Sequence, residues 1–218
     1  MKEYGPMSRH VRRLIMNLIK NLNFTSVLDV GCGEGSLLRE IMALRPDLST
    51  TAGIDISEGA LELAKVKVPE ASFYLMDIQT DKLDASFDLV VCSEVLEHVE
   101  KDQEAISKLV DMTRHYLLVV TLQGKMRYFE SHVGHVRNYK KHELVNMLSN
   151  ANLNVDIIKE WGYPFYSPLY RDTLNYVPPA TTEGQYGLIR RLICSFIYYV
   201  MFLNSKSKGD LVFCLCSK

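Results

Sequence analysis

The sequence lacks an excess of charge of either sign, because 25 lysines and arginines offset 26 aspartates and glutamates. Proteins that attract nucleic acid through their net charge carry a basic excess, so this balance argues against nucleic acid as a partner. The five cysteines are odd in number and lack the spacing of a metal site, so we expect buried, reduced thiols. The first residues lack the apolar core of a signal peptide, which together with reduced thiols predicts a cytoplasmic protein.

The sequence also lacks an apolar run long enough to cross a bilayer. Its most apolar segment, residues 188–203, is uninterrupted only from Leu192, whereas a spanning helix needs about 20 residues. We expect a buried core helix here. Peripheral membrane contact and the docking of a partner helix are the alternatives, because arginines interrupt the start of the segment and Lys206 and Lys208 follow it.

One further absence concerns dinucleotide binding. An apolar strand at residues 27–30 leads directly into a turn with Gly31, Gly33 and Gly35. A G-x-G-x-x-G fingerprint would need its third glycine at the position of Ser36, and this departure disfavours an NAD-dependent oxidoreductase. Glycines in this pattern still allow the backbone to turn tightly and to approach a ligand at the start of a helix.

Acidic or polar residues follow the apolar strands that surround this turn. Asp29 lies within the first strand, Asp55 ends the second about 20 residues after the glycines, and Asp77 ends the third. The fourth strand ends in Ser93 and Glu94. An acid at a strand end can accept hydrogen bonds from ribose hydroxyls, and the alternative is that it only caps the next helix.

Strand-D-x-G-x-G-x-G followed by these strands resembles the class I S-adenosylmethionine (SAM)-dependent methyltransferases. The resemblance implies that the chain binds SAM and releases S-adenosylhomocysteine. It further implies that the glycine loop holds the methionine end, the second strand end holds the ribose, and the third holds the adenine. The residues implied for the methionine end are Asp29, Gly31, Cys32, Gly33 and Gly35. Those implied for the ribose are Asp55 and Ile56, and those for the adenine are Asp77 and Ile78. Ser93 completes the cofactor site that the resemblance implies.

Apolar periodicity predicts an α/β fold. We expect a doubly wound, seven-stranded, mostly parallel sheet with helices on both faces, in a single domain over residues 1–218. Residues 1–24 form a helical cap, and a long insertion at residues 161–209 precedes the last strand. The further helices expected are 8–22, 57–67, 101–112 and 141–151, and the further strands are 116–122, 155–159 and 211–216.

The loop after the fourth strand carries the candidate acceptor-side residues. If a helix begins there, Glu94, Glu97 and His98 lie at i, i+3 and i+4 and share one face. E-x-x-E-H with a later histidine resembles the small-RNA 2′-O-methyltransferases, and E-x-x-E-H alone resembles the ubiquinone-biosynthesis O-methyltransferases. By that resemblance Glu94, Glu97, His98 and His135 would hold Mg²⁺. The alternatives are His132 or His135 as a general base without metal, and a purely structural role for both histidines.

The glutamates and histidines on the acceptor side of the expected site favour methylation of a hydroxyl oxygen. A hydroxyl must be deprotonated for the reaction, whereas an amine need only be neutral. The insertion begins with aromatic residues from Trp161 to Tyr170, and Pro178 and Pro179 follow. We interpret it as a substrate lid for a small-molecule, lipid-linked or glycan acceptor, or as a satellite core. A catalytically silent SAM-binding partner subunit and an RNA 2′-O-methyltransferase are the alternative functions.

Overall fold

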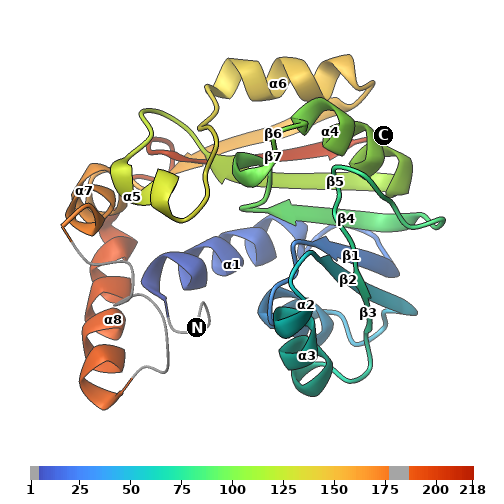
Figure 1. Cartoon of the computed structure of the whole chain (residues 1–218), viewed down its shortest axis with the longest axis horizontal. Helices are drawn as coiled ribbons and strands as arrows, with labels where there is room; N and C mark the ends of the chain where they lie inside the picture. Colours follow the sequence, from blue (N-terminus) through green and yellow to red (C-terminus); the bar gives the residue numbers. More distant parts are fainter. Residues whose placement is uncertain (1–4, 177–186) are drawn as a thin grey trace.

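The computed structural model describes residues 5–176 and 187–218, which form one seven-stranded sheet in the order β3-β2-β1-β4-β5-β7-β6, flanked by helices (Figure 1). The strands are β1 (Ser26–Val30), β2 (Thr50–Asp55), β3 (Ser72–Leu75), β4 (Phe87–Ser93), β5 (Thr113–Leu122), β6 (Asn154–Trp161) and β7 (Leu211–Ser217). The helices are α1 (Pro6–Ile19), α2 (Ser36–Leu44), α3 (Glu58–Lys67), α4 (Asp102–Met112), α5 (Tyr128–His132), α6 (Lys141–Asn150), α7 (Arg171–Leu174) and α8 (Leu188–Val200). Short helical turns are η1 (Leu96–His98), η2 (Phe165–Tyr170) and η4 (Met201–Leu203).

The sheet confirms the predicted fold class. Strand β1 pairs in parallel with both β2 and β4, and the order of the strands reverses at this point. Strand β7 runs antiparallel to both β5 and β6. In a doubly wound sheet the loops on the two sides of the reversal diverge and leave a crevice at the carboxyl ends of the strands. The loops after β1 and β4 therefore border the expected ligand site.

Each face of the sheet has its own hydrophobic core. Leu28 and Val30 of β1 belong to one core, whereas Val27 belongs to the other, as the alternation of side chains along a strand requires. Leu109 of α4 and Leu144 of α6 complete the first core. Figure 1 shows α4 and α6 on one side of the sheet and α1 on the other.

Four of the five cysteines are buried and all five are free, as expected for reduced thiols. Burial raises the pKa of Cys214 to about 12, and the pKa of Cys216 rises to about 12 for the same reason. Cys194 is the exception, since it lies half-buried on α8.

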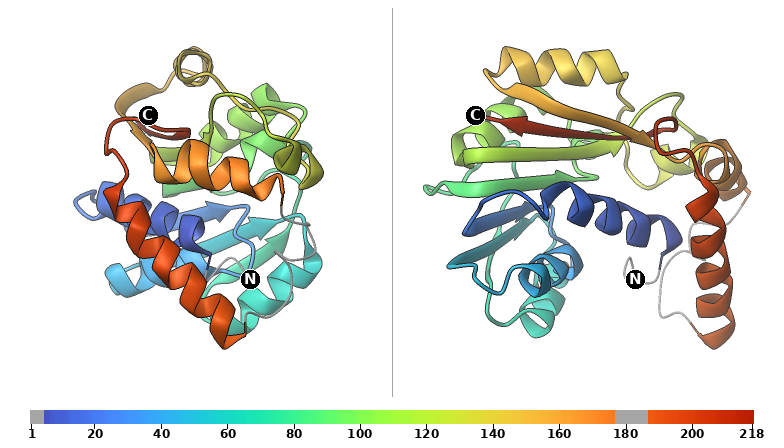
Figure 2. Two further views of the ribbon diagram at one scale, coloured as in Figure 1. Left: turned by 90° about the vertical axis from the view of Figure 1, so that its left-hand side faces the viewer. Right: turned by 180° about the vertical axis from the view of Figure 1, so that it is seen from behind.

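The insertion forms helical segments, and its main helix does not belong to the core. The prediction of a buried core helix in residues 188–203 is wrong, because no residue of α8 is buried and Met201 is the one buried residue of the turn that follows. Trp161 and Tyr166 already fill the core beside α1, so that α8 packs against α1 instead of the sheet. Figure 2 shows α8 on the outer side of the molecule. Pro178 and Pro179 lie outside the described residues.

Within residues 5–176 and 187–218, no helix combines the length and the apolar character that crossing a bilayer requires.

Candidate cofactor and acceptor site

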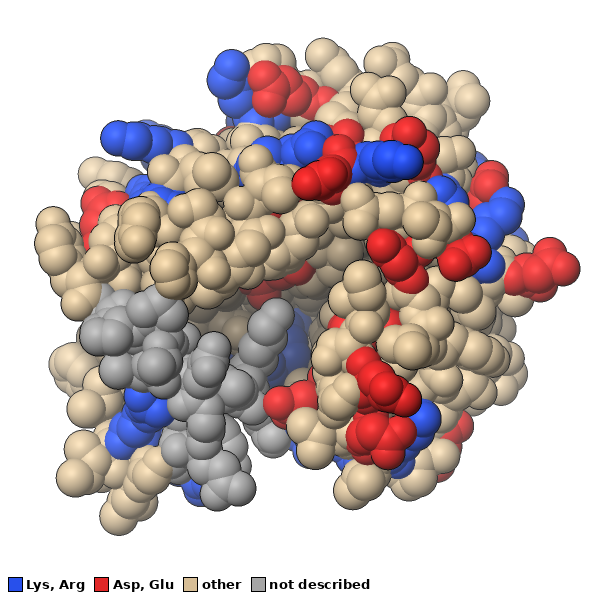
Figure 3. Space-filling view, viewed as in Figure 1, with Lys and Arg blue, Asp and Glu red and all other residues tan. Residues whose placement is uncertain are grey.

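A cavity of about 380 Å³ opens at the carboxyl ends of β1, β2 and β4. The glycine loop after β1 forms one wall, and Ser93 and Glu94 at the end of β4 form another. Helix α1 covers it with Val11, Arg12 and Ile15. Figure 3 shows a hollow near the middle of this face of the molecule, with acidic and basic atoms inside it.

The glycine loop needs its glycines for conformation and for space. Gly31 has a φ of 72°, and a Cβ added to it would lie 2.2 Å from Cγ2 of Val95, so that no larger residue fits between β1 and the loop after β4. Gly33 has a φ of 53° and open space where a Cβ would point. Its backbone N–H donates to Oδ2 of Asp55 at 2.8 Å, which ties the loop to the end of β2.

Asp55 has a second backbone partner, because its Oδ1 accepts from the N–H of Ser57 at 2.8 Å. Ser57 in turn caps α3 by accepting from the N–H of Ala60. Asp55 therefore holds the glycine loop and the start of α3 while it lines the cavity. Capping of the next helix and contact with a cofactor are therefore compatible roles for this acid.

The charges around the cavity suit a cationic ligand that also carries one carboxylate. Asp29, Glu34, Asp55 and Glu94 line it together with a single guanidinium, that of Arg12. Arg12 is 8% exposed, and its Nε donates to Oε1 of Glu40 at 2.7 Å. The N-terminus of α2, capped by Gly35, opens beside the same loop and favours an anion. SAM combines a sulfonium, an ammonium and a carboxylate, so the donor and acceptor set fits it.

Glu94 is held in an unusual backbone conformation. Its φ of 58° lies in the left-handed region, and its N–H donates to the carbonyl of Val120 in β5 at 2.8 Å. Such a conformation in a residue other than glycine is costly and persists only when neighbouring contacts enforce it. The pairing of β4 with β5 therefore turns the chain at Glu94 and directs the residue to the cavity.

The predicted helical face over Glu94, Glu97 and His98 is wrong. Only Leu96–His98 is helical, as one 3-10 turn, because the chain reverses at Glu94 before the turn begins. Glu97 is completely buried and accepts from Oγ1 of Thr121 at 2.8 Å. His98 points the other way, is exposed, and lies with Nδ1 3.1 Å from the carbonyl of Gly134.

Two of the three predicted histidines lie together. The rings of His98 and His135 are 4.5 Å apart at 74°. Burial and the charge of His98 lower the pKa of His135 to about 4, so that this imidazole is neutral at pH 7. His132 is exposed, and its ring packs 5.6 Å from that of Tyr128.

A buried ionic network joins Arg171 to Glu130 and Asp210. Arg171 is 2% exposed, and its Nε donates to Oε1 of Glu130 at 2.6 Å while its Nη1 donates to Oδ2 of Asp210 at 2.5 Å. The pKa of the fully buried Tyr166 lies well above its usual value. Burial and the charges of Glu94 and Glu130 raise it, and the charge of Arg171 opposes this rise. These side chains are therefore neighbours. Their partners are distant in sequence, and no motif or spacing signals them.

Residues 28–116 match the model of a methyltransferase domain family. The ubiquinone biosynthesis O-methyltransferase of Idiomarina loihiensis is 43% identical over 88 residues, which cover 38% of this chain and 35% of that protein. The malonyl-[acyl-carrier protein] O-methyltransferase of Acetivibrio thermocellus is 28% identical over 139 residues, which cover 60% of this chain and 49% of that protein. This chain thus matches less than half the length of these two relatives.

The fold is also similar to that of the N-methyltransferase NodS from Bradyrhizobium japonicum WM9, solved in complex with S-adenosylhomocysteine. The TM-score is 0.63 at 17% identity, and the match covers 98% of this chain and 88% of that one. This chain carries a class I SAM-dependent methyltransferase domain. The family match begins in β1 and ends in β5, so it includes the glycine loop, Asp55 and Glu94.

Three residues expected at the cofactor of the methyltransferase domain lie outside the lining of the cavity. Ile56 is 69% exposed, and Ile78 packs into the core beneath α4. Asp77 accepts from the backbone N–H of Gln79 at 2.9 Å. Contact of these residues with the ribose and adenine stays a prediction.

The residues expected to hold Mg²⁺ do not form a metal site in the methyltransferase domain. Among the described residues there is no group of three or more histidine, cysteine, aspartate or glutamate side chains that could hold a metal ion. Burial of Glu97 against β5 separates it from His98, and this explains why Glu94, Glu97, His98 and His135 do not converge.

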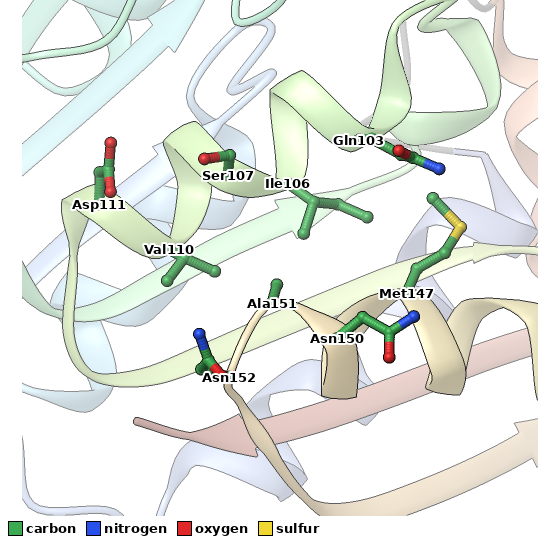
Figure 4. Close-up of a pocket in the computed structure, with 9 residues that line it drawn as sticks. All are labelled: Gln103, Ile106, Ser107, Val110, Asp111, Met147, Asn150, Ala151 and Asn152. Carbon is green, nitrogen blue, oxygen red and sulfur yellow. The ribbon is translucent and has the colours of Figure 1, made fainter.

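The methyltransferase domain has a second cavity, of about 470 Å³, between α4 and α6. Figure 4 shows that Ile106 and Val110 of α4 face Met147 of α6 across it. Its single acid, Asp111, accepts from Nζ of Lys82 at 2.5 Å. This cavity includes no residue of the glycine loop, and nothing in its lining points to a ligand.

Proposed function

We propose that this domain transfers the methyl group of SAM to a hydroxyl oxygen of a small-molecule, lipid-linked or glycan acceptor. The observation that carries the proposal is that the glycine loop after β1 and Glu94 after β4 line one cavity. SAM supplies an activated methyl group on a sulfonium. Because methyl transfer is an in-line displacement, the protein has to position the two reactants and accept a proton from the hydroxyl.

On the cofactor side, the glycine loop and the start of α2 hold the amino-acid end. The carboxylates of Asp29 and Asp55 lie in the same lining, where they favour the ammonium and the ribose hydroxyls. Among the described residues, Arg12 is the one cation in the lining, and it pairs with the carboxylate of the ligand or stabilises its neighbours. Val11 and Ile15 of α1 exclude water from this end of the cavity.

On the acceptor side, we assign to Glu94 the hydrogen bond from the acceptor hydroxyl, because it alone of the acceptor-side candidates lines the cavity. His135 is neutral at pH 7 and weakly basic, so it serves as a hydrogen-bond acceptor and not as the main base. The names of the relatives include both O- and N-methyltransferases. The choice of oxygen therefore depends on Glu94, the one acceptor-side candidate in the lining.

The experiment measures binding and turnover separately. Isothermal titration calorimetry with S-adenosylhomocysteine tests the cofactor site. Transfer of labelled methyl from SAM into fractionated extract (lipid, glycan, RNA, protein and small molecules) tests the reaction. Glu94→Gln should lower transfer by about 100-fold and leave S-adenosylhomocysteine affinity within about threefold, since it removes a proton acceptor. Glu100→Gln, at an exposed position in the same loop, should change neither.

Each outcome has one meaning. Label in the lipid, glycan or small-molecule fraction supports the proposal and names the acceptor class. Label in RNA would assign 2′-O-methylation instead, and loss of labelling with a chelator would establish a metal. If S-adenosylhomocysteine binds and no fraction is labelled, the transferase proposal fails and a silent SAM-binding subunit takes its place.

A further inference from the structure

Helix α8 and the turn that follows it present a continuous apolar face to solvent. Seven large apolar side chains of this segment are each more than half exposed: Leu188, Ile189, Leu192, Ile193, Phe196, Tyr199 and Leu203. Their spacing of three or four residues places most of them on one side of the helix. A contiguous exposed apolar surface of this kind marks an interaction site, since isolated proteins rarely leave one uncovered.

The opposite side of α8 is fixed to α1 by specific contacts. Nε2 of His10 lies 2.8 Å from the carbonyl of Tyr198, and their rings are 4.4 Å apart. The guanidinium of Arg9 lies 3.7 Å from the centre of the Tyr198 ring, and that of Arg13 lies 4.6 Å from the centre of Phe202. Figure 2 shows α8 beside the N-terminal half of α1, away from the sheet. The orientation of the apolar face is thus set by the fold.

The two described segments that form and support this face carry basic residues and no acidic ones. Residues 5–22 and 187–209 contain no aspartate or glutamate, although the whole chain has a net charge of −1. Their basic residues are Arg9, Arg12, Arg13, Lys20, Arg190, Arg191, Lys206 and Lys208. Arg12 is buried in the lining of the cofactor cavity and pairs with Glu40, so it does not contribute to the docking surface. The pKa of Lys159 in β6 is lowered by burial and by the charges of Arg13 and Lys206, which shows that positive groups from three segments lie near one another. In Figure 3 the part of the lower left that grey atoms do not cover, where α8 lies, is blue and tan.

We propose that the outward face of α8 docks on the surface of an anionic membrane. An amphipathic helix with large apolar residues on one face and basic residues beside it lies in the interface between lipid headgroups and chains. Each lysine or arginine near such a surface adds attraction to anionic lipids. A second copy of the chain fits less well, because a symmetric pair would bring the basic residues of segments 187–209 from two copies against one another. The surface is separate from the cofactor cavity and does not depend on the proposed reaction.

The test is flotation of the full chain with vesicles of phosphatidylcholine alone or with about a third of phosphatidylserine. Binding should require phosphatidylserine and weaken as salt is raised, because salt screens the basic residues. The pair Leu192→Gln and Phe196→Gln should weaken partitioning by about tenfold for each side chain withdrawn from the lipid. The pair Lys206→Gln and Lys208→Gln should weaken it by about fivefold for each charge removed.

The matched control is the pair Leu63→Gln and Val66→Gln, which changes two exposed apolar residues on α3. It should leave partitioning unchanged. Thermal unfolding and S-adenosylhomocysteine binding, which should be equal in all variants, report folding independently of membrane contact. Absence of wild-type binding to either vesicle, or equal binding by the Leu192 and Phe196 variant, would overturn the proposal. A dimer in light scattering that the same pair dissociates would assign the face to a second copy instead.

Discussion

Oδ2 of Asp55 accepts a hydrogen bond of 2.8 Å from the backbone N–H of Gly33, and this bond joins the end of β2 to the glycine loop of β1. Because Oδ1 also accepts a backbone N–H, that of Ser57, the change Asp55→Asn directs an amide N–H₂ at one of these donors. We expect affinity for S-adenosylhomocysteine to fall by about tenfold or more. Calorimetric titration measures it.

The control for this variant is Asp84→Asn, at an exposed position remote from the cavity lining. Its affinity should match that of the wild type. Equal affinity of the Asp55 and Asp84 variants would contradict the role that we give to the Gly33 bond.

Gly31→Ala should reduce cofactor binding through backbone strain and a steric clash. The added Cβ would lie 2.2 Å from Cγ2 of Val95 at a φ of 72°, so both the loop and Val95 must move. We expect a loss of S-adenosylhomocysteine affinity of at least about tenfold and a lower melting temperature. Gly59→Ala in α3, where a Cβ meets no atom within 4 Å, is the matched control and should bind normally. If Gly31→Ala binds as tightly as Gly59→Ala, the loop is not as constrained as its geometry indicates.

The sheet and the cofactor loop could be predicted because their signals are local. Apolar runs that end in Asp55 or Ser93 identify strands and their carboxyl ends without knowledge of the fold, and glycines at alternate positions identify the tight turn. The contribution of Arg12 to the lining could not be predicted in this way. It lies on an amphipathic helix with several arginines, and only packing decides which one faces the cavity.

The acceptor side was harder to predict because its geometry depends on tertiary contacts. The reversal at Glu94 follows from the bond between its N–H and the carbonyl of Val120, which no helical spacing anticipates. Arg171 reaches Glu130 across 41 residues of sequence, and a pairing at that separation leaves no periodic signal. The amphipathic pattern of residues 188–203 indicates an apolar face but not the direction in which that face points, so the expectation of a core helix was wrong.

The buried ion pair of Arg171 and Glu130 should contribute to the stability of the fold. Arg171→Met leaves the carboxylate of Glu130, which is only 5% exposed, without its 2.6 Å partner. Removal of one member of a buried ion pair typically costs about 3 kcal/mol or more in the free energy of unfolding. Denaturant titration measures this loss.

Two comparisons isolate the electrostatic cause. The double change Arg171→Met and Glu130→Leu should recover part of the lost stability, because the buried carboxylate of Glu130 is then removed and Asp210 keeps its ion pair with Arg127. Lys65→Met breaks the exposed pair with Glu62 and should cost about 0.5 kcal/mol or less. If Glu130→Leu lowers the free energy of unfolding of Arg171→Met as much as an independent second substitution would, the pairing argument is contradicted.

The stability of the α1–α8 contact should depend on pH through His10. Burial and the charges of Arg13 and Arg9 lower the pKa of His10 from 6.5 to about 4, against the opposing effect of its bond to Tyr198. A histidine whose folded pKa is depressed binds protons more weakly than it does in the unfolded chain. Its contribution to stability is therefore present above pH 6.5 and is lost as the pH falls from 6.5 towards 4. The lowered pKa of His135 acts in the same direction over the same range.

For His10 alone the expected loss of unfolding free energy between pH 7 and pH 5 is about 2 kcal/mol. His10→Phe keeps a ring against Trp161 and Tyr198 but cannot be protonated, so its stability should fall less steeply over this range, with the remaining slope due to groups such as His135. Denaturant titrations at both pH values measure the difference, and His142→Gln, at an exposed position on α6, should retain the full wild-type slope. If His10→Phe also retains it, the buried imidazole is not the group that couples this contact to pH.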